Sequence, residues 1–235
     1  MTDVTFGNPI VTPNYFGHEH NDPELTWNRG WNIDIDGDGD QEILASSGKL
    51  FDDGLGSKGP QPVVVLDFNG TEIAHTTSSY LTSVPTTTLT RLFVHADFNN
   101  DGHEDLFLVN TGEEATIPFP GETNVLLLSN GNGEFEDSTS NVFQGTDFSH
   151  AAAAADFDLD GDIDIFVANI GSDEDQPGYI LLNNGDGTFS GPEWMQSSTQ
   201  GSQSALFSSN FNDVDTPNWV ELMDVNADGA IDLYF

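Results

Sequence analysis

Carboxylate side chains recur at a fixed spacing in four nine-residue segments of this 235-residue chain. The segments begin at Asp34, Asp97, Asp156 and Asp224, roughly 60 residues apart, and each reads D-x-[DN]-x-D-G-x-x-[DE]. In a coiling loop, oxygen side chains at positions 1, 3, 5 and 9 can point at one centre, while glycine at position 6 permits the sharp turn. An all-oxygen cage suits a hard cation, and without cysteine we expect Ca²⁺ rather than Zn²⁺ or copper.

Other known calcium loops fit this pattern less well. An EF-hand needs Glu at position 12 of its loop, and the chain has Ala45, Leu108, Val167 and Phe235 there. The glycine-rich G-G-x-G-x-D repeat of calcium β-rolls is absent, and disulfide-linked calcium repeats need the cysteines that this chain lacks. Mg²⁺ is less favoured because it keeps its waters rather than enter a protein cage.

Short apolar runs flank the acidic segments and predict the strands that hold them. An apolar residue precedes each first Asp, and runs such as 106–109 and 165–168 follow the ninth position. Further along, the runs 125–128 and 179–182 lead into Asn-Gly turns, a strong hairpin signal. Residues 151–155 are all alanine, but their place in the repeat predicts an inner strand rather than a helix. Each unit therefore consists of strand, acidic loop, strand, linker, strand, Asn-Gly turn and strand, which predicts an all-β propeller of four-stranded antiparallel blades.

The acidic loop and the later N-G-[DN]-G-x-F turn together resemble the FG-GAP/VCBS family of calcium-binding β-propeller repeats, with integrin-α-like blades. The resemblance implies about four Ca²⁺ ions, one in each hairpin between the first two strands of a blade. It implies these side-chain ligands: Asp34, Asp36, Asp38 and Glu42; Asp97, Asn99, Asp101 and Asp105; Asp156, Asp158, Asp160 and Asp164; Asp224, Asn226, Asp228 and Asp232. Backbone carbonyls of Asp40, His103, Asp162 and Ala230 would add one ligand each. Glu42 stands where the family usually has Asp, so we expect a looser first site.

The repeat divides the chain into an N-terminal segment and three and a half blades. We expect the segment at 1–20, whole blades at 21–80, 81–143 and 144–203, and a partial blade at 204–235. Their calcium loops are 34–42, 97–105, 156–164 and 224–232. Because the family usually closes about seven blades into a ring, we expect the chain to be part of a longer propeller. Alternatively, residues 4–11 pair with the last unit and close a smaller ring.

Net charge excludes several classes of partner. Forty acidic residues against four Lys and Arg give a formal charge of −36, and seventeen of the forty acids lie in the four loops. Nucleic acids and anionic membrane surfaces require cations on the protein. No apolar run is long enough to span a membrane, and residues 1–20 lack the features of a signal peptide. Calcium-dependent modules work where free Ca²⁺ is plentiful, so we expect an extracellular or cell-surface location.

Three functions remain open. The first is a binding or adhesion module for glycan or protein partners, presented by the loops at 48–60, 111–122 and 170–177. The second is a polysaccharide lyase or hydrolase with weak catalytic candidates Arg91, His95 and His150 on strands that line the propeller channel. The third is a structural surface or filament component that self-associates. No nucleophile motif or phosphate-binding loop is present, so the sequence favours a protein without chemistry of its own.

Overall fold

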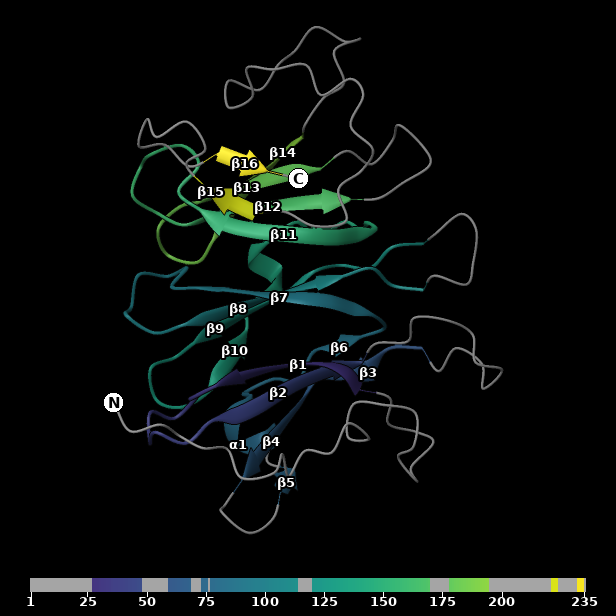
Figure 1. Ribbon diagram of the computed structural model, residues 1–235, viewed down its shortest axis with the longest axis vertical. Helices are drawn as coiled ribbons and strands as arrows, with labels where there is room; N and C mark the ends of the chain where they lie inside the picture. Colours follow the sequence, from purple (N-terminus) through teal and green to yellow (C-terminus); the bar gives the residue numbers. More distant parts are fainter. Residues whose placement is uncertain are drawn as a thin grey trace, which may run out of the picture.

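The computed structural model describes residues 27–47, 59–68, 73–75, 77–113, 120–169, 178–194, 221–223 and 232–234. Within these residues the fold is all-β, as predicted, and its largest elements are three four-stranded antiparallel sheets. The sheets succeed one another in chain order along the long axis of the molecule (Figure 1). Each is a meander in which consecutive long strands pair, which is the arrangement of a propeller blade.

The strands of the three sheets, which we call the first, second and third blades, follow the predicted repeat. The first blade contains β1 (Trp27–Ile33), β2 (Glu42–Ser47), β4 (Val64–Phe68) and β5 (Ile73–His75). The second contains β7 (Thr90–Ala96), β8 (Asp105–Asn110), β9 (Val125–Ser129) and β10 (Phe135–Asp137). The third contains β11 (Ser149–Ala155), β12 (Asp164–Asn169), β13 (Tyr179–Asn183) and β14 (Phe189–Trp194).

Shorter elements lie outside the three four-stranded sheets. Strand β3 (Gln61–Pro62) pairs with β6 (Thr86–Thr87), and β15 (Glu221–Met223) pairs with β16 (Asp232–Tyr234). The repeat does not predict the one-turn helix α1 (Thr77–Tyr80) or the 3-10 helix η2 (Thr139–Asn141).

The alanine run confirms that the repeat predicts structure better than helix propensity does here. Residues 151–155 lie in β11, where they pair with β12 in regular antiparallel register. Inner strand β11 packs against inner strand β7, which in turn contacts β1 (Figure 1). Small side chains on β11 let the neighbouring inner strand approach closely, so the tertiary fold overrides the local preference of alanine for helix.

Apolar side chains between the blades form the core. Alternate residues of β8 point to opposite faces: Leu106 and Leu108 pack toward the first blade, and Phe107 and Val109 toward the third. All four are fully buried. A strand covered on both faces is expected to be apolar without interruption, which accounts for the unbroken runs in the sequence. The second blade is therefore held on both sides by its neighbours.

Candidate metal centres

Each acidic segment whose placement is described forms the hairpin loop between the first two strands of its blade. Loop 34–42 joins β1 to β2, loop 97–105 joins β7 to β8, and loop 156–164 joins β11 to β12. Position 4 of every loop has a left-handed backbone, with φ of +74° at Gly37, +58° at Asn100 and +64° at Leu159. The three loops therefore share a left-handed residue at position 4 although the residue type differs.

The carboxylate at position 1 organises the turn from inside. In the second blade, Asp97 accepts hydrogen bonds from the backbone N–H groups of Asp101 (3.0 Å) and Gly102 (2.9 Å). In the third blade, Asp156 does the same with Asp160 (3.1 Å) and Gly161 (3.0 Å). These bonds bend the chain around the first carboxylate, so the later side chains are turned back toward it.

Position 9 closes the loop with a buried carboxylate. Asp105 accepts hydrogen bonds from the backbone N–H groups of Phe98 and Ser129, both at 2.7 Å. Asp164 accepts equivalent bonds from Phe157 and Asn183, both at 2.8 Å. Each of these carboxylates thus ties its own loop to the end of the third strand of the blade.

Burial makes the position-9 carboxylates costly to ionise without a cation. Desolvation raises the pKa of Asp105 to about 6, although its backbone hydrogen bonds oppose the shift. Desolvation also raises the pKa of Asp164, and the negative charges of Asp158 and Asp160 add to the increase. The pKa of Glu42 is raised for the same reasons, burial first and neighbouring acids second. A nearby cation would favour the ionised form of all three groups.

Carboxylates converge in two of the loops. In loop 34–42, oxygen atoms of Asp34, Asp36 and Glu42 lie within 4.8 Å of one another. In loop 156–164 the converging residues occupy the same positions 1, 3 and 9: Asp156, Asp158 and Asp164. Loop 97–105 has an amide, Asn99, at position 3, and this amide donates to Asp101 at 3.1 Å.

For the remaining predicted ligands, the structure shows hydrogen bonds within the loop. At position 5, the side chains of Asp38, Asp101 and Asp160 each accept a bond from the backbone N–H of position 7 at 2.8–2.9 Å. Position 7 is Asp40, His103 or Asp162, whose carbonyls are the predicted backbone ligands. Loop 224–232 lies outside the described residues, except for the backbone of Asp232 in β16.

The sequence did not predict how tightly each loop packs against the Asn-Gly turn of the following blade. A side-chain carbon added at Gly133 would lie 2.8 Å from Cβ of Asp36. One added at Gly187 would lie 2.6 Å from Cδ1 of Leu128 and 3.3 Å from Cβ of Asn99. Both glycines have positive φ, 84° and 73°. They are therefore needed for the close approach as well as for the turn.

Hydrogen bonds also join loop 97–105 to the third blade. The side chain of Asn100 donates to Oδ1 of Asp162 (2.8 Å) and to the carbonyl of Gly185 (3.2 Å). The side chain of Asn183, which is buried, donates to the carbonyls of Phe98 (2.7 Å) and Ile163 (2.9 Å). Two neighbouring acidic loops are thus in direct contact.

The weak catalytic candidates are only partly brought together. Nη2 of Arg91 lies 3.3 Å from Nε2 of His150, across the contact between β7 and β11. His95 lies four residues beyond Arg91, about 13 Å along an extended strand, and it contacts Glu104 and the ring of Trp31 instead. Arg91 and His150 form a pair on the inner strands, and His95 belongs to a different environment.

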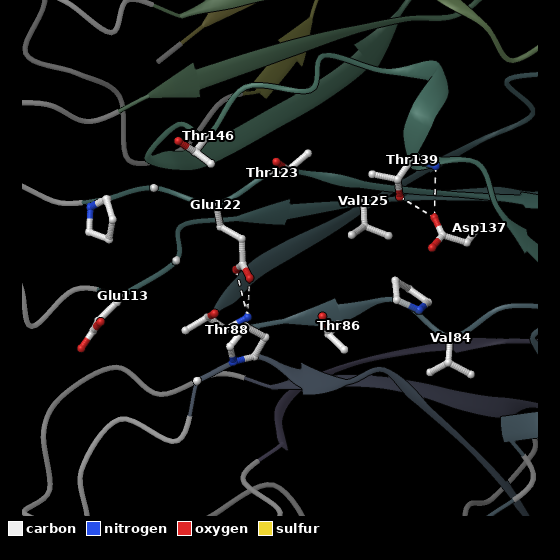
Figure 2. Close-up of a pocket in the computed structure, with 16 residues that line it drawn as sticks. Val84, Thr86, Thr88, Glu113, Glu122, Thr123, Val125, Asp137, Thr139 and Thr146 are labelled. Carbon is white, nitrogen blue, oxygen red and sulfur yellow. Dashed lines mark hydrogen bonds between the residues drawn. The ribbon is translucent and has the colours of Figure 1, made fainter.

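A hollow of about 660 Å³ is bordered by the described parts of two of the predicted partner-binding loops, 48–60 and 111–122 (Figure 2). Gly59 and Pro60 border it on one side, and parts of 112–123 border it on the other. Five threonines, three carboxylates and five valine or proline residues line it, among them Thr86, Thr146, Glu113 and Val84. Glu122 spans the hollow and accepts two bonds from the N–H of Thr88, at 2.7 and 2.9 Å (Figure 2).

Four-stranded antiparallel blades with an acidic loop in the first hairpin define a β-propeller-type repeat module. A family model described as FG-GAP-like repeat matches residues 97–167 and 156–235, more than half of the sequence. The chain therefore belongs to the FG-GAP-like repeat family. None of the curated proteins matches the sequence. FG-GAP-like repeats are typical of extracellular proteins, and no helix within the described part of the chain has the length and apolar character to cross a membrane.

Proposed function

We propose that this chain is a calcium-binding propeller module of an extracellular or cell-surface protein. The observation that carries the proposal is the convergence of carboxylates in loops 34–42 and 156–164, within 4.8 Å in each. Like charges at this distance repel, and burial of Glu42 and Asp164 adds a desolvation cost. A divalent cation with oxygen preference removes both penalties, since it neutralises the acids and replaces lost hydration.

Calcium titration tests this proposal directly. In calorimetry, we expect about four Ca²⁺ ions to bind each chain with Kd of roughly 10⁻⁴–10⁻³ M, the range of extracellular calcium modules. Mg²⁺ should bind much more weakly, because the cage offers too few positions for its waters. A chain that binds no ion at about 10 mM Ca²⁺, or that binds Mg²⁺ equally well, contradicts the proposal.

The module is further proposed to bind a glycan or protein ligand at the hollow between 59–60 and 112–123. Support comes from its position between Pro60 and Gly121 and from the hydroxyl and carboxylate groups in its lining, which can exchange hydrogen bonds with a polar ligand. The strong negative charge of the chain favours neutral over anionic glycans.

A glycan array probed in calcium tests the binding role. We expect the wild-type chain to retain a subset of neutral glycans and Thr146→Arg to lose them at least tenfold, because a long cation would fill the hollow. Ser190→Arg is the matched control, because Ser190 is also exposed but lies on β14, outside the hollow. Equal retention by Thr146→Arg and wild type excludes the hollow. Self-association without any ligand would instead favour a structural component.

A further inference from the structure

We infer that the calcium sites of the second and third blades are energetically coupled, and that Asn100 carries a large part of the coupling. This inference rests on the proposed calcium function and adds to it a regulatory property, namely that occupancy of one loop raises the affinity of the next. The observation behind it is the pair of hydrogen bonds from Asn100 in loop 97–105 to Asp162 and Gly185 in the third blade.

The residues contacted by Asn100 are part of the predicted ion cage or lie beside it. Asp162 occupies position 7 of loop 156–164, the position whose carbonyl is the predicted backbone ligand, and its N–H donates to the position-5 carboxylate of Asp160 at 2.9 Å. Gly185 belongs to the Asn-Gly turn, and a Cβ there would lie 2.6 Å from Oδ2 of Asp162. An ion that orders Asp162 therefore also orders the two groups that accept hydrogen bonds from Asn100, the carboxylate of Asp162 and the carbonyl of Gly185.

A second, buried connection runs beneath the first. The backbone N–H of Asn183 donates to the position-9 carboxylate of Asp164, and its side chain donates to the carbonyl of Phe98. Phe98 in turn donates its N–H to Asp105, the position-9 carboxylate of the neighbouring loop. The two position-9 carboxylates are thus linked through two intervening residues, Phe98 and Asn183.

These contacts couple the sites because ordering one loop reduces the cost of ordering the other. An ion bound in loop 156–164 holds Asp162 and Asn183 in place, so Asn100 and Phe98 lose less conformational freedom when loop 97–105 binds its own ion. The coupling must be reciprocal, and typical coupling between sites changes affinity from about 5-fold upward. We therefore expect about fivefold between these two loops.

Asn100 can be tested without disturbing the loop backbone. Its φ of +58° is one that glycine adopts freely, and loop 34–42 already has glycine, Gly37, at the same position. Asn100→Gly therefore removes the amide alone. Leu159→Gly is the matched control, since it makes the same backbone change at position 4 of loop 156–164, where the side chain is 76% exposed.

The experiment follows each loop separately by NMR during a calcium titration. The amide signals of Gly102 and Gly161, at position 6 of each loop, report occupancy of the second and third blades. In an otherwise wild-type chain, disabling the third-blade site with Asp160→Ala should raise the calcium midpoint at Gly102 about fivefold. In the Asn100→Gly background, the same change should shift that midpoint less than twofold. Leu159→Gly should leave the full fivefold shift.

The outcomes separate the inference from the function on which it rests. If neither glycine signal responds to calcium in the wild-type chain, the proposed function fails and the inference fails with it. If both respond but Gly102 is indifferent to Asp160→Ala, calcium binding stands and the coupling is refuted. If coupling persists in Asn100→Gly, the assignment to Asn100 is wrong. As a second variant, Asn100→Asp places a carboxylate against Asp162 and should also lower the coupling below twofold.

Discussion

Replacing Asp105 by alanine should destabilise the protein by about 3 kcal/mol in chelator, and by more in calcium, where the loss of a proposed ion ligand adds to the effect. The buried Asp105 carboxylate accepts hydrogen bonds from the N–H groups of Phe98 and Ser129. Its removal leaves two buried donors without partners, each worth about 1–3 kcal/mol. The substitution also removes the cost of burying a charged carboxylate, the cost that raises the pKa of Asp105 to about 6. This gain offsets part of the loss. For a chain of this size, the net effect corresponds to a fall in Tm of roughly 6–12 °C.

Unfolding by urea in excess chelator is the measurement that checks this result. The control is Asp101→Ala in the same loop, because Asp101 is exposed and accepts a backbone bond only from His103 among the described contacts. In chelator, Asp101→Ala should change the free energy of unfolding by less than about 0.5 kcal/mol. Equal losses for the two variants in chelator would show that Asp105 acts only as an ion ligand and does not clasp the hairpin.

The position-9 acids illustrate what sequence alone can and cannot reveal. The nine-residue pattern predicts Asp105 and Asp164 as ion ligands, and its repetition places both in the first hairpin of their blades, where the structure has them. Their observed structural role depends on the N–H groups of Ser129 and Asn183, 24 and 19 residues further along the chain. Backbone donors carry no sequence signature, so only the folded structure shows this clasp.

The repeat pattern could not predict the contacts between blades either. The pattern treats each unit alike and therefore predicts what is common to all units, such as the strand at 151–155. Asn100 bonds to Asp162, 62 residues away, and a glycine or a leucine takes its place in the other described loops. A contact that only one of the units makes cannot be predicted from a repeated pattern.

A buried polar cluster between the second and third blades was missed for a related reason. The amide of Asn124 donates to Oγ of Ser149 (3.0 Å) and to the hydroxyl of Tyr179 (3.2 Å), and Ser149 donates to Asp147 at 2.8 Å. Burial raises the pKa of Asp147, whose Oδ2 is buried without a hydrogen-bond partner in the described structure. Asn124 and Asp147 lie in segments between strands, where polar residues are typically exposed, so the burial of this cluster follows from blade packing and not from residue type.

Replacing Asp160 by alanine should lower the Tm in calcium and leave it unchanged in chelator. Asp160 is exposed, and its carboxylate accepts one backbone bond, from Asp162. Desolvation first, and the negative charge of Asp160 second, raise the pKa of Asp158. Losing a site at a calcium concentration 100 times Kd removes about 2.7 kcal/mol, or roughly 5–11 °C. Differential scanning calorimetry with calcium and with chelator measures both values. Asp186→Ala, which removes a nearby exposed acid of the Asn-Gly turn, should change the two Tm values equally, and the same behaviour from Asp160→Ala would refute its role as a ligand.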